Sequence, residues 1–381
     1  MKIKTTLFLF LVLLPCVSLP ARKQLHVRFI LHSDAVSKDS MVFITGSIPQ
    51  LGNWDPGKVK MKYAGNQNWS KEIILNGTGS IEYKYTLGSW AKEGAKPDGK
   101  PLSNFQVKVE GDRTIRDTVL LWTSQQPKTP VPSSLTGTVI FHRAMHGKGM
   151  KDRDIAVWLP PGYNESKTER YPVLYMHDGQ NVFDVATAAY GAEWRMDEIM
   201  DSLIRVKAVT PAIVVGINNT DDRNMEYGPG KEGEEYMNFI VQRLKPFIDS
   251  AYRTLPGRLH TWTGGASSGG TISFLMVWEH PDIFSAAICM SPAFKIDKLD
   301  LVKTVTRSAV RKEVRFYMYL GGVGLENDLR PGFDQMMEAL KNKGYREGID
   351  FIRVIDPQQR HYETAWSKRL PEALEWVMKE R

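Results

Sequence analysis

In the sequence TGGASSGG, residues 263–270, Gly265, Ser267 and Gly269 form the pattern G-x-S-x-G. Residues 259–263 before it suit a β-strand, and residues 271–279 after it suit a helix. A nucleophile on such a strained strand-to-helix turn needs glycine two positions to either side, because side chains would clash there. This context favours Ser267 as a catalytic nucleophile over a Gly/Ser-rich loop without chemistry.

A serine nucleophile needs a base, and the base needs a carboxylate that orients it. In the fold that carries this motif, the order along the chain is serine, acid, histidine. Only His280 and His361 follow Ser267. His280 ends the helix after the nucleophile, whereas His361 lies between the strand-like residues 351–355 and the helical residues 363–379. We therefore expect His361 to be the base.

The acid is expected in the loop after the strand at residues 314–320. Glu326 and Asp328 are both candidates there. The strand-to-loop placement that a triad needs favours Glu326, and Asp328 stays open as the alternative.

The chain from residue 136 to 381 alternates apolar strand-like runs with helical ones. Residues 172–176 and 212–217 are typical of buried strands, and residues 196–204 and 236–251 of helices. This alternation predicts an α/β fold, a parallel sheet flanked by helices.

The region from residue 24 to 123 has a different sequence pattern, with short runs of β-branched and aromatic residues separated by turn residues. The clearest runs are residues 26–31, 41–44 and 81–86, and the pattern predicts a small all-β sandwich. Residues 124–135 follow, with three prolines among polar residues, and we interpret them as a linker between two domains.

The first 21 residues are typical of a cleaved signal peptide. Lys2 and Lys4 precede the apolar residues 7–14, which are too short to span a bilayer comfortably. We expect a secreted or periplasmic protein. Cys16 would also suit a lipoprotein signal, although Pro15 is a poor neighbour for lipidation. Without this segment Cys289 is the one cysteine, so no intramolecular disulfide is expected.

The formal net charge of +7 is scattered along the chain and forms no basic block. Nucleic-acid footprints are clustered, so we expect no nucleic-acid partner. No segment after the signal has the apolar length of a membrane span, and no metal-binding motif is present, so neither a membrane partner nor a metal or organic cofactor is expected.

The second domain resembles the esterase family of α/β-hydrolases, which includes enterochelin and feruloyl esterases, S-formylglutathione hydrolase and mycolyltransferases. The resemblance covers nearly all of residues 136–381. It rests on residues 171–181 (YPVLYMHDGQN), Glu193-Trp194, Asp197, residues 214–219 (VVGINN), Arg223, Glu226-Tyr227, residues 245–249, the serine turn, His280-Pro281, residues 290–292, His361, Ala365-Trp366 and Leu370-Pro371.

The resemblance implies a triad of Ser267, Glu326 and His361. It also implies an oxyanion hole formed by the backbone N–H groups of Ser268 and Gln180. Residues 321–324 depart from the family pattern before the acid, and Ser268 stands where the family commonly has methionine. His177 and Asp178 are interpreted as groups that shape a loop, and Arg223 and Glu226 are expected to form an ion pair.

The first domain resembles the starch-binding CBM20-like sandwich through residues 42–55 (VFITGSIPQLGNWD), residues 82–85 and residues 88–90. In that family the residues that match Trp54, Lys84, Trp90 and Asn104 contact glucan. Glycan is therefore an expected partner of this domain, with Trp54 plugging the sandwich as the structural alternative.

Together these features predict a secreted serine carboxylic-ester hydrolase that acts through an acyl-enzyme on small-molecule or carbohydrate-linked esters, such as feruloyl or acetyl esters. The alternatives are a siderophore esterase of the enterochelin type, an acyltransferase, and a glycan-binding protein with an inactive hydrolase domain.

Overall fold

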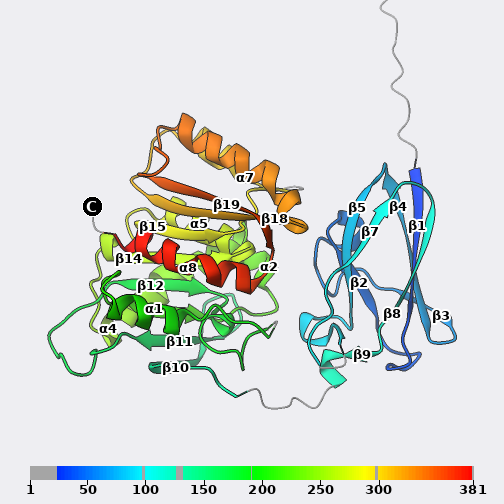
Figure 1. Ribbon diagram of the computed structural model, residues 1–381, viewed down its shortest axis with the longest axis horizontal. Helices are drawn as coiled ribbons and strands as arrows, with labels where there is room; N and C mark the ends of the chain where they lie inside the picture. Colours follow the sequence, from blue (N-terminus) through cyan, green and yellow to red (C-terminus); the bar gives the residue numbers. More distant parts are fainter. Residues whose placement is uncertain (1–23, 97–98, 126–131, 190, 297–298, 380–381) are drawn as a thin grey trace, which may run out of the picture.

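The computed structural model describes residues 24–96, 99–125, 132–189, 191–296 and 299–379, which form a β-sandwich and an α/β unit (Figure 1). The predicted signal peptide, residues 1–21, lies outside the described residues, as do residues 126–131 of the predicted linker.

The sandwich packs two sheets around one core. The first has the order β3 (Lys62–Gly65), β4 (Asn68–Asn76), β1 (Gln24–His32), β8 (Arg113–Thr118), and the second has β2 (Phe43–Gly46), β5 (Gly79–Thr86), β7 (Phe105–Val109). A short pair, β6 (Gly94–Ala95) and β9 (Leu121–Trp122), forms a separate two-stranded sheet. Alternate residues of β1, among them Val27 and Phe29, enter the core, as a strand with one solvent-exposed face requires. The predicted all-β domain is confirmed.

The α/β unit is built on an eight-stranded mixed sheet, which confirms the predicted fold class. The strands β12 to β19 in this sheet run parallel, and β10 and β11 extend it in antiparallel fashion. The order is β10 (Thr138–Met145), β11 (Arg153–Leu159), β13 (Ile213–Ile217), β12 (Val173–His177), β14 (Thr261–Ala266), β15 (Ala286–Met290), β18 (Arg315–Val323), β19 (Phe351–Arg360). The central strands are buried on both faces, which explains their near-continuous apolar sequences.

Helices cover both faces of this sheet (Figure 1). One face packs against α1 (Met196–Arg205) and α8 (Glu363–Met378). The other face packs against α3 (Lys231–Phe239), α4 (Lys245–Ala251), α5 (Ser268–Glu279), α6 (Leu301–Arg307) and α7 (Leu325–Asn342). The short helix α2 (Arg223–Glu226) follows β13, and β16 (Lys295–Ile296) pairs with β17 (Leu299–Asp300). No helix in the described part of the chain is long and apolar enough to cross a membrane.

The single helix expected at residues 236–251 is divided in the structure. A π-helical segment, Ile240–Leu244, separates α3 from α4. Pro246 stands in the first turn of α4 and has no N–H to donate to the preceding turn, so the helical hydrogen-bond pattern changes there.

Candidate active site

Ser267 occupies a strained turn between β14 and α5. Its backbone has φ 56° and ψ −128°, a conformation that non-glycine residues rarely adopt. The backbone N–H of Ser267 donates to Met290 O on the neighbouring strand (2.8 Å), and the helix begins at the next residue. The turn therefore holds the serine at the carboxyl end of β14.

Close contacts around this turn explain why glycine stands at positions 265 and 269. A Cβ on Gly265 would lie 2.7 Å from the backbone of Gly269, and a Cβ on Gly269 would lie 3.0 Å from Asp178 Oδ2. Strand and helix cross too closely at Gly265 for any side chain. The steric reason that the sequence pattern suggested is thus present in the structure.

His361 and Glu326 are brought together although 35 residues separate them. His361 Nδ1 lies 3.2 Å from Glu326 Oε1, and the Glu326 side chain is fully buried. Ser291 Oγ donates to the same carboxylate oxygen (2.6 Å) and accepts from Trp366 Nε1 (3.0 Å). Asp328, the other candidate acid, is exposed. The geometry therefore supports Glu326 as the partner of the histidine.

The sheet topology brings the serine to the same edge. Ser267 follows β14, Glu326 lies just beyond β18, and His361 directly follows β19. These strands run parallel, so their carboxyl ends share one edge of the sheet, where ligands of open α/β sheets bind. A shallow hollow lined by Ile204 and Trp376 lies instead at the amino ends of β13 and β19, and we assign it no part in the chemistry.

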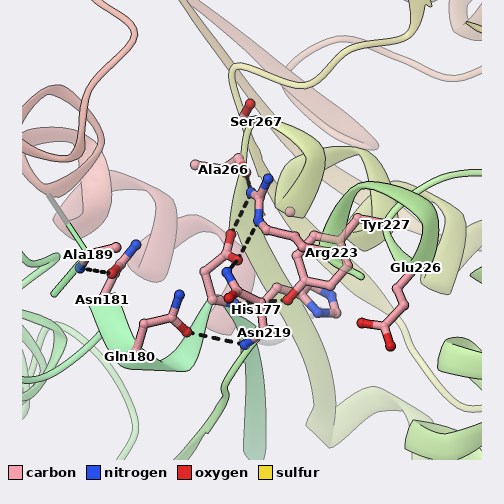
Figure 2. A network of polar contacts seen from close by, with 12 residues as sticks. His177, Gln180, Asn181, Ala189, Asn219, Arg223, Glu226, Tyr227, Ala266 and Ser267 are labelled. Atoms are coloured by element: carbon pink, nitrogen blue, oxygen red, sulfur yellow. Dashed lines mark hydrogen bonds and ion pairs between the residues drawn. The ribbon is translucent and has the colours of Figure 1, made fainter. Parts of the chain in front are cut away.

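The two expected oxyanion donors lie at the ends of neighbouring parallel strands. Ser268 is the first residue of α5, where backbone N–H groups have no partner within the helix. Gln180 lies in a short 3-10 turn, Gly179–Asn181, after β12. Its side-chain Oε1 accepts from Asn219 N (3.2 Å), which fixes the loop (Figure 2).

Arg223 is paired with Asp178, contrary to the ion pair with Glu226 that the sequence suggested (Figure 2). Arg223 Nε and Nη2 each lie 2.7 Å from an oxygen of Asp178, and Asn219 Nδ2 donates to it at 2.6 Å. Burial opposes ionisation, but Arg223 and Asn219 outweigh it and hold the pKa of Asp178 below its usual value. Asp178 is therefore an anionic anchor of the loop.

Glu226 pairs instead with the buried Arg153, at 2.6 and 3.1 Å. Arg153 lies 73 residues earlier, on β11, and nothing in the local sequence marks it as a partner.

His177 belongs to a buried polar chain under the serine turn. Its Nδ1 lies 2.7 Å from the Tyr236 hydroxyl, and its Nε2 lies 3.2 Å from Thr263 Oγ1. Burial lowers the pKa of His177 to about 3, so its imidazole is neutral. Its two hydrogen-bond partners lie on α3 and β14, so His177 connects the end of β12 to these elements.

Glu363 is a buried carboxyl group beside the site that no sequence motif had indicated. It is 3% exposed at the start of α8, two residues after His361. Burial raises its pKa to about 7, and the negative charge of Asp178 adds to the effect. Its position next to the base is the one sequence signal that could have drawn attention to it.

The four glycan candidates of the sandwich differ in their surroundings. The rings of Trp54 and Trp90 lie 6.4 Å apart and tilted by 36°. Asn104 is exposed and donates to Glu82 Oε2 (2.9 Å). The ammonium group of Lys84 forms an ion pair with Glu93 and is largely buried, so it is not directed at a surface ligand. The tryptophan pair is the stronger candidate surface.

Two family models match the chain. The model described as "Putative esterase" matches residues 149–376, and the model described as "Starch binding domain" matches residues 24–112. The first match covers more than half of the chain and contains Ser267, Glu326 and His361.

Individual proteins with similar sequences or folds agree with these matches. An endo-1,4-beta-xylanase/feruloyl esterase of Xylanibacter ruminicola is 28% identical over 203 residues, 51% of this chain. The match spans a quarter of the length of that relative. A solved ferulic acid esterase has TM-score 0.52 and 21% identity, over 63% of this chain and 98% of its own. The enterobactin esterase of Shigella flexneri, solved in the presence of enterobactin, has TM-score 0.54 and 15% identity, over 93% of both chains.

Proposed function

Because this chain belongs to the esterase family of α/β-hydrolases, we propose that it is a serine carboxylic-ester hydrolase whose triad is Ser267, Glu326 and His361. The observation that carries the proposal is the hydrogen bond of 3.2 Å between His361 Nδ1 and Glu326 Oε1, at the sheet edge where the strained turn holds Ser267. A serine, a histidine and an orienting carboxylate in this arrangement are the groups that acyl transfer requires.

The mechanism follows from these groups. Glu326 holds His361 in the tautomer with the proton on Nδ1, which leaves Nε2 free to accept the proton of Ser267. Ser267 Oγ attacks the ester carbonyl, and His361 returns the proton to the leaving alcohol. The acyl-enzyme is then hydrolysed when His361 takes a proton from water. The backbone N–H groups of Ser268 and Gln180 stabilise the tetrahedral oxyanion, a contribution of about 3 kcal/mol per donor in comparable sites.

Carbohydrate-linked esters are the proposed substrate class. The support is the starch-binding family match at residues 24–112, together with the similarity to a xylanase/feruloyl esterase. Trp54 and Trp90 offer aromatic faces on which sugar rings stack, so the sandwich would hold the polysaccharide near the catalytic unit. We further propose that residues 1–21 direct export, since such substrates lie outside the cell.

A siderophore ester is the second candidate substrate. The specific observation is that the fold of the enterobactin esterase covers 93% of both chains and therefore both units, whereas the ferulic acid esterase covers 63% of this chain. Fold similarity at this identity does not transfer a substrate.

The test is a comparison of methyl ferulate, p-nitrophenyl acetate and a cyclic catecholate ester as substrates for the wild type, Ser267→Ala and Ser268→Ala. Ser268→Ala is the matched control, because it keeps the backbone N–H. We expect hydrolysis of methyl ferulate to fall about 10⁴-fold or more in Ser267→Ala and less than tenfold in Ser268→Ala. Hydrolysis of the catecholate ester alone would favour a siderophore ester as the substrate. Equal activity of Ser267→Ala and the wild type would refute the triad.

A further inference from the structure

Three acidic side chains gather outside the triad at the start of α1. Glu193, Asp197 and Glu198 each offer a carboxylate oxygen, and these oxygens all lie within 4.8 Å of one another. Oxygen ligands bind calcium at about 2.3–2.6 Å, so two ligands of one ion lie at most about 5 Å apart. The spacing of the cluster therefore matches a shared cation.

A second observation points to a ligand. Asp197 is fully buried, and its Oδ1 has no hydrogen-bond donor among the residues that the structure describes. Glu193 Oε2 and Glu198 Oε2 are likewise buried without a donor within the described ranges. A carboxylate oxygen removed from water without a donor is costly, and three of them at one point favour a shared positive partner, either a cation or a proton.

The surrounding charges fit a divalent ion. Arg195 lies 3.4 Å from Glu198 as an ion pair and is mostly exposed. When all three carboxylates are ionised, as an ion would hold them, they and this arginine leave two negative charges to be balanced. A proton is the alternative occupant, since burial and the adjacent Glu198 raise the pKa of Asp197 to about 8.

We propose that Glu193, Asp197 and Glu198 form a calcium-binding site that fastens the interdomain linker to the catalytic unit. The ligands are hard oxygens without nitrogen or sulfur, the set that calcium takes. Calcium also tolerates the irregular geometry of side chains that come from a loop and the first turn of a helix, whereas magnesium demands a near-ideal octahedron.

Other oxygens of Glu193 and Asp197 hold the end of the linker and the first residue after it. Ser134 Oγ donates to Glu193 Oε1 (2.6 Å), and Thr136 N donates to Asp197 Oδ2 (2.6 Å). Each of these carboxylates would then bridge the linker through one oxygen and the ion through the other.

The site also connects to the triad. Trp194 follows Glu193, and its ring lies 6.0 Å from that of Trp366, which donates to Ser291 Oγ beside Glu326. The ion would position these groups without touching the substrate.

The experiment uses the full chain after treatment with EDTA. Calcium chloride or magnesium chloride is then added, and thermal unfolding is followed. We expect calcium at about a hundredfold over its Kd to raise the unfolding midpoint of the catalytic unit by about 5 °C, and magnesium to raise it much less. Terbium, which takes the place of calcium, should show luminescence sensitised by Trp194.

Glu198→Gln is the informative variant, because Glu198 lies at the edge of the cluster and its replacement keeps the side-chain shape. It should lose the calcium shift and most of the terbium signal. Glu338→Gln, an exposed position on α7, is the control and should keep both. Asp197→Asn adds an independent check of the same loss.

A calcium shift that persists in both Glu198→Gln and Asp197→Asn would overturn the proposal, because the ion would then bind elsewhere. An absent shift in the wild type, or an equal shift with magnesium, would overturn it as well. Loss of ester hydrolysis in Ser267→Ala is independent of these readouts, so failure of the triad and failure of the calcium site are distinguishable.

Discussion

Glu326 and Asp328 show how much depends on a single residue position. Both lie in the first turn of α7, which begins at Leu325. Two residues apart on a helix means about 200° of rotation, so only one of them can face the histidine. Glu326 is buried against His361, and Asp328 is exposed. The sequence could not distinguish Glu326 from Asp328, because the residue at which α7 begins determines which carboxylate faces His361. Helix ends are difficult to place to within one or two residues.

Ser291 is expected to position the acid. Its hydroxyl donates to Glu326 and accepts from the Trp366 indole, which leaves the carboxylate one fixed orientation. Ser291→Ala should lower kcat for ester hydrolysis about tenfold with little change in KM, since the reacting atoms remain. Steady-state kinetics of Ser291→Ala measure kcat and KM, and Ser285→Ala serves as the control. A change in KM alone would contradict the positioning role.

Glu363 makes stability depend on pH. Its pKa is about 7 in the folded protein, compared with an ordinary value of 4.5. The folded state therefore retains a proton that the unfolded chain loses, so this group lowers stability as the pH rises from about 4.5 to about 7. Glu363→Gln should remove this slope and stabilise the protein by about 3 kcal/mol at pH 8.

Urea unfolding between pH 4.5 and pH 8 measures the effect. Glu375→Gln, an exposed position on the same helix, should leave the slope unchanged. A parallel slope in the wild type and Glu363→Gln would contradict the assignment.

At the scale of elements, the crossing of β14 and α5 holds the nucleophile in place. Gly265→Ala would place a Cβ 2.7 Å from the backbone of Gly269, where neither segment can move freely. We expect a loss of about 3 kcal/mol of unfolding free energy or failure to fold. Gly257→Ala is the control, because the space around Gly257 is open. Chemical denaturation measures the unfolding free energy of both variants. Equal unfolding free energies would contradict the close approach of β14 and α5 at Gly265.

The elements that the sequence predicted well share one property, burial on both faces. The apolar runs before Asp178, Asn218 and Ser291 are central strands, and such strands need no alternation to be recognised. The motif at Ser267 was informative because a local steric demand produces it.

Partners distant in sequence were not predictable. Arg153 and Glu226 are 73 residues apart, and Arg223 reaches Asp178 across 45 residues. The sequence placed two of these residues in one expected ion pair because they are neighbours on a helical turn. Charge pairs across a sheet depend on strand order, which the local pattern does not contain.

At the level of the whole molecule, the proposed function gives the sandwich and the catalytic unit separate tasks. If the tryptophan pair binds glycan, Trp54→Ala and Trp90→Ala should each weaken retention on soluble starch about tenfold or more and leave hydrolysis of small esters unchanged. Affinity electrophoresis in starch gels measures this, with the exposed Met41→Ala as control. If neither substitution changes the retention on starch, the tryptophan pair does not bind glycan.

Covalent labelling tests directly whether Ser267 is the nucleophile. An organophosphate that reacts with activated serines should add one equivalent to the protein, and peptide mass spectrometry should locate it on Ser267. His361→Ala should slow the labelling strongly, because the serine then has no base. A stoichiometric adduct on Ser267 is the predicted result. An adduct on another serine, or no adduct in folded protein, would contradict the account.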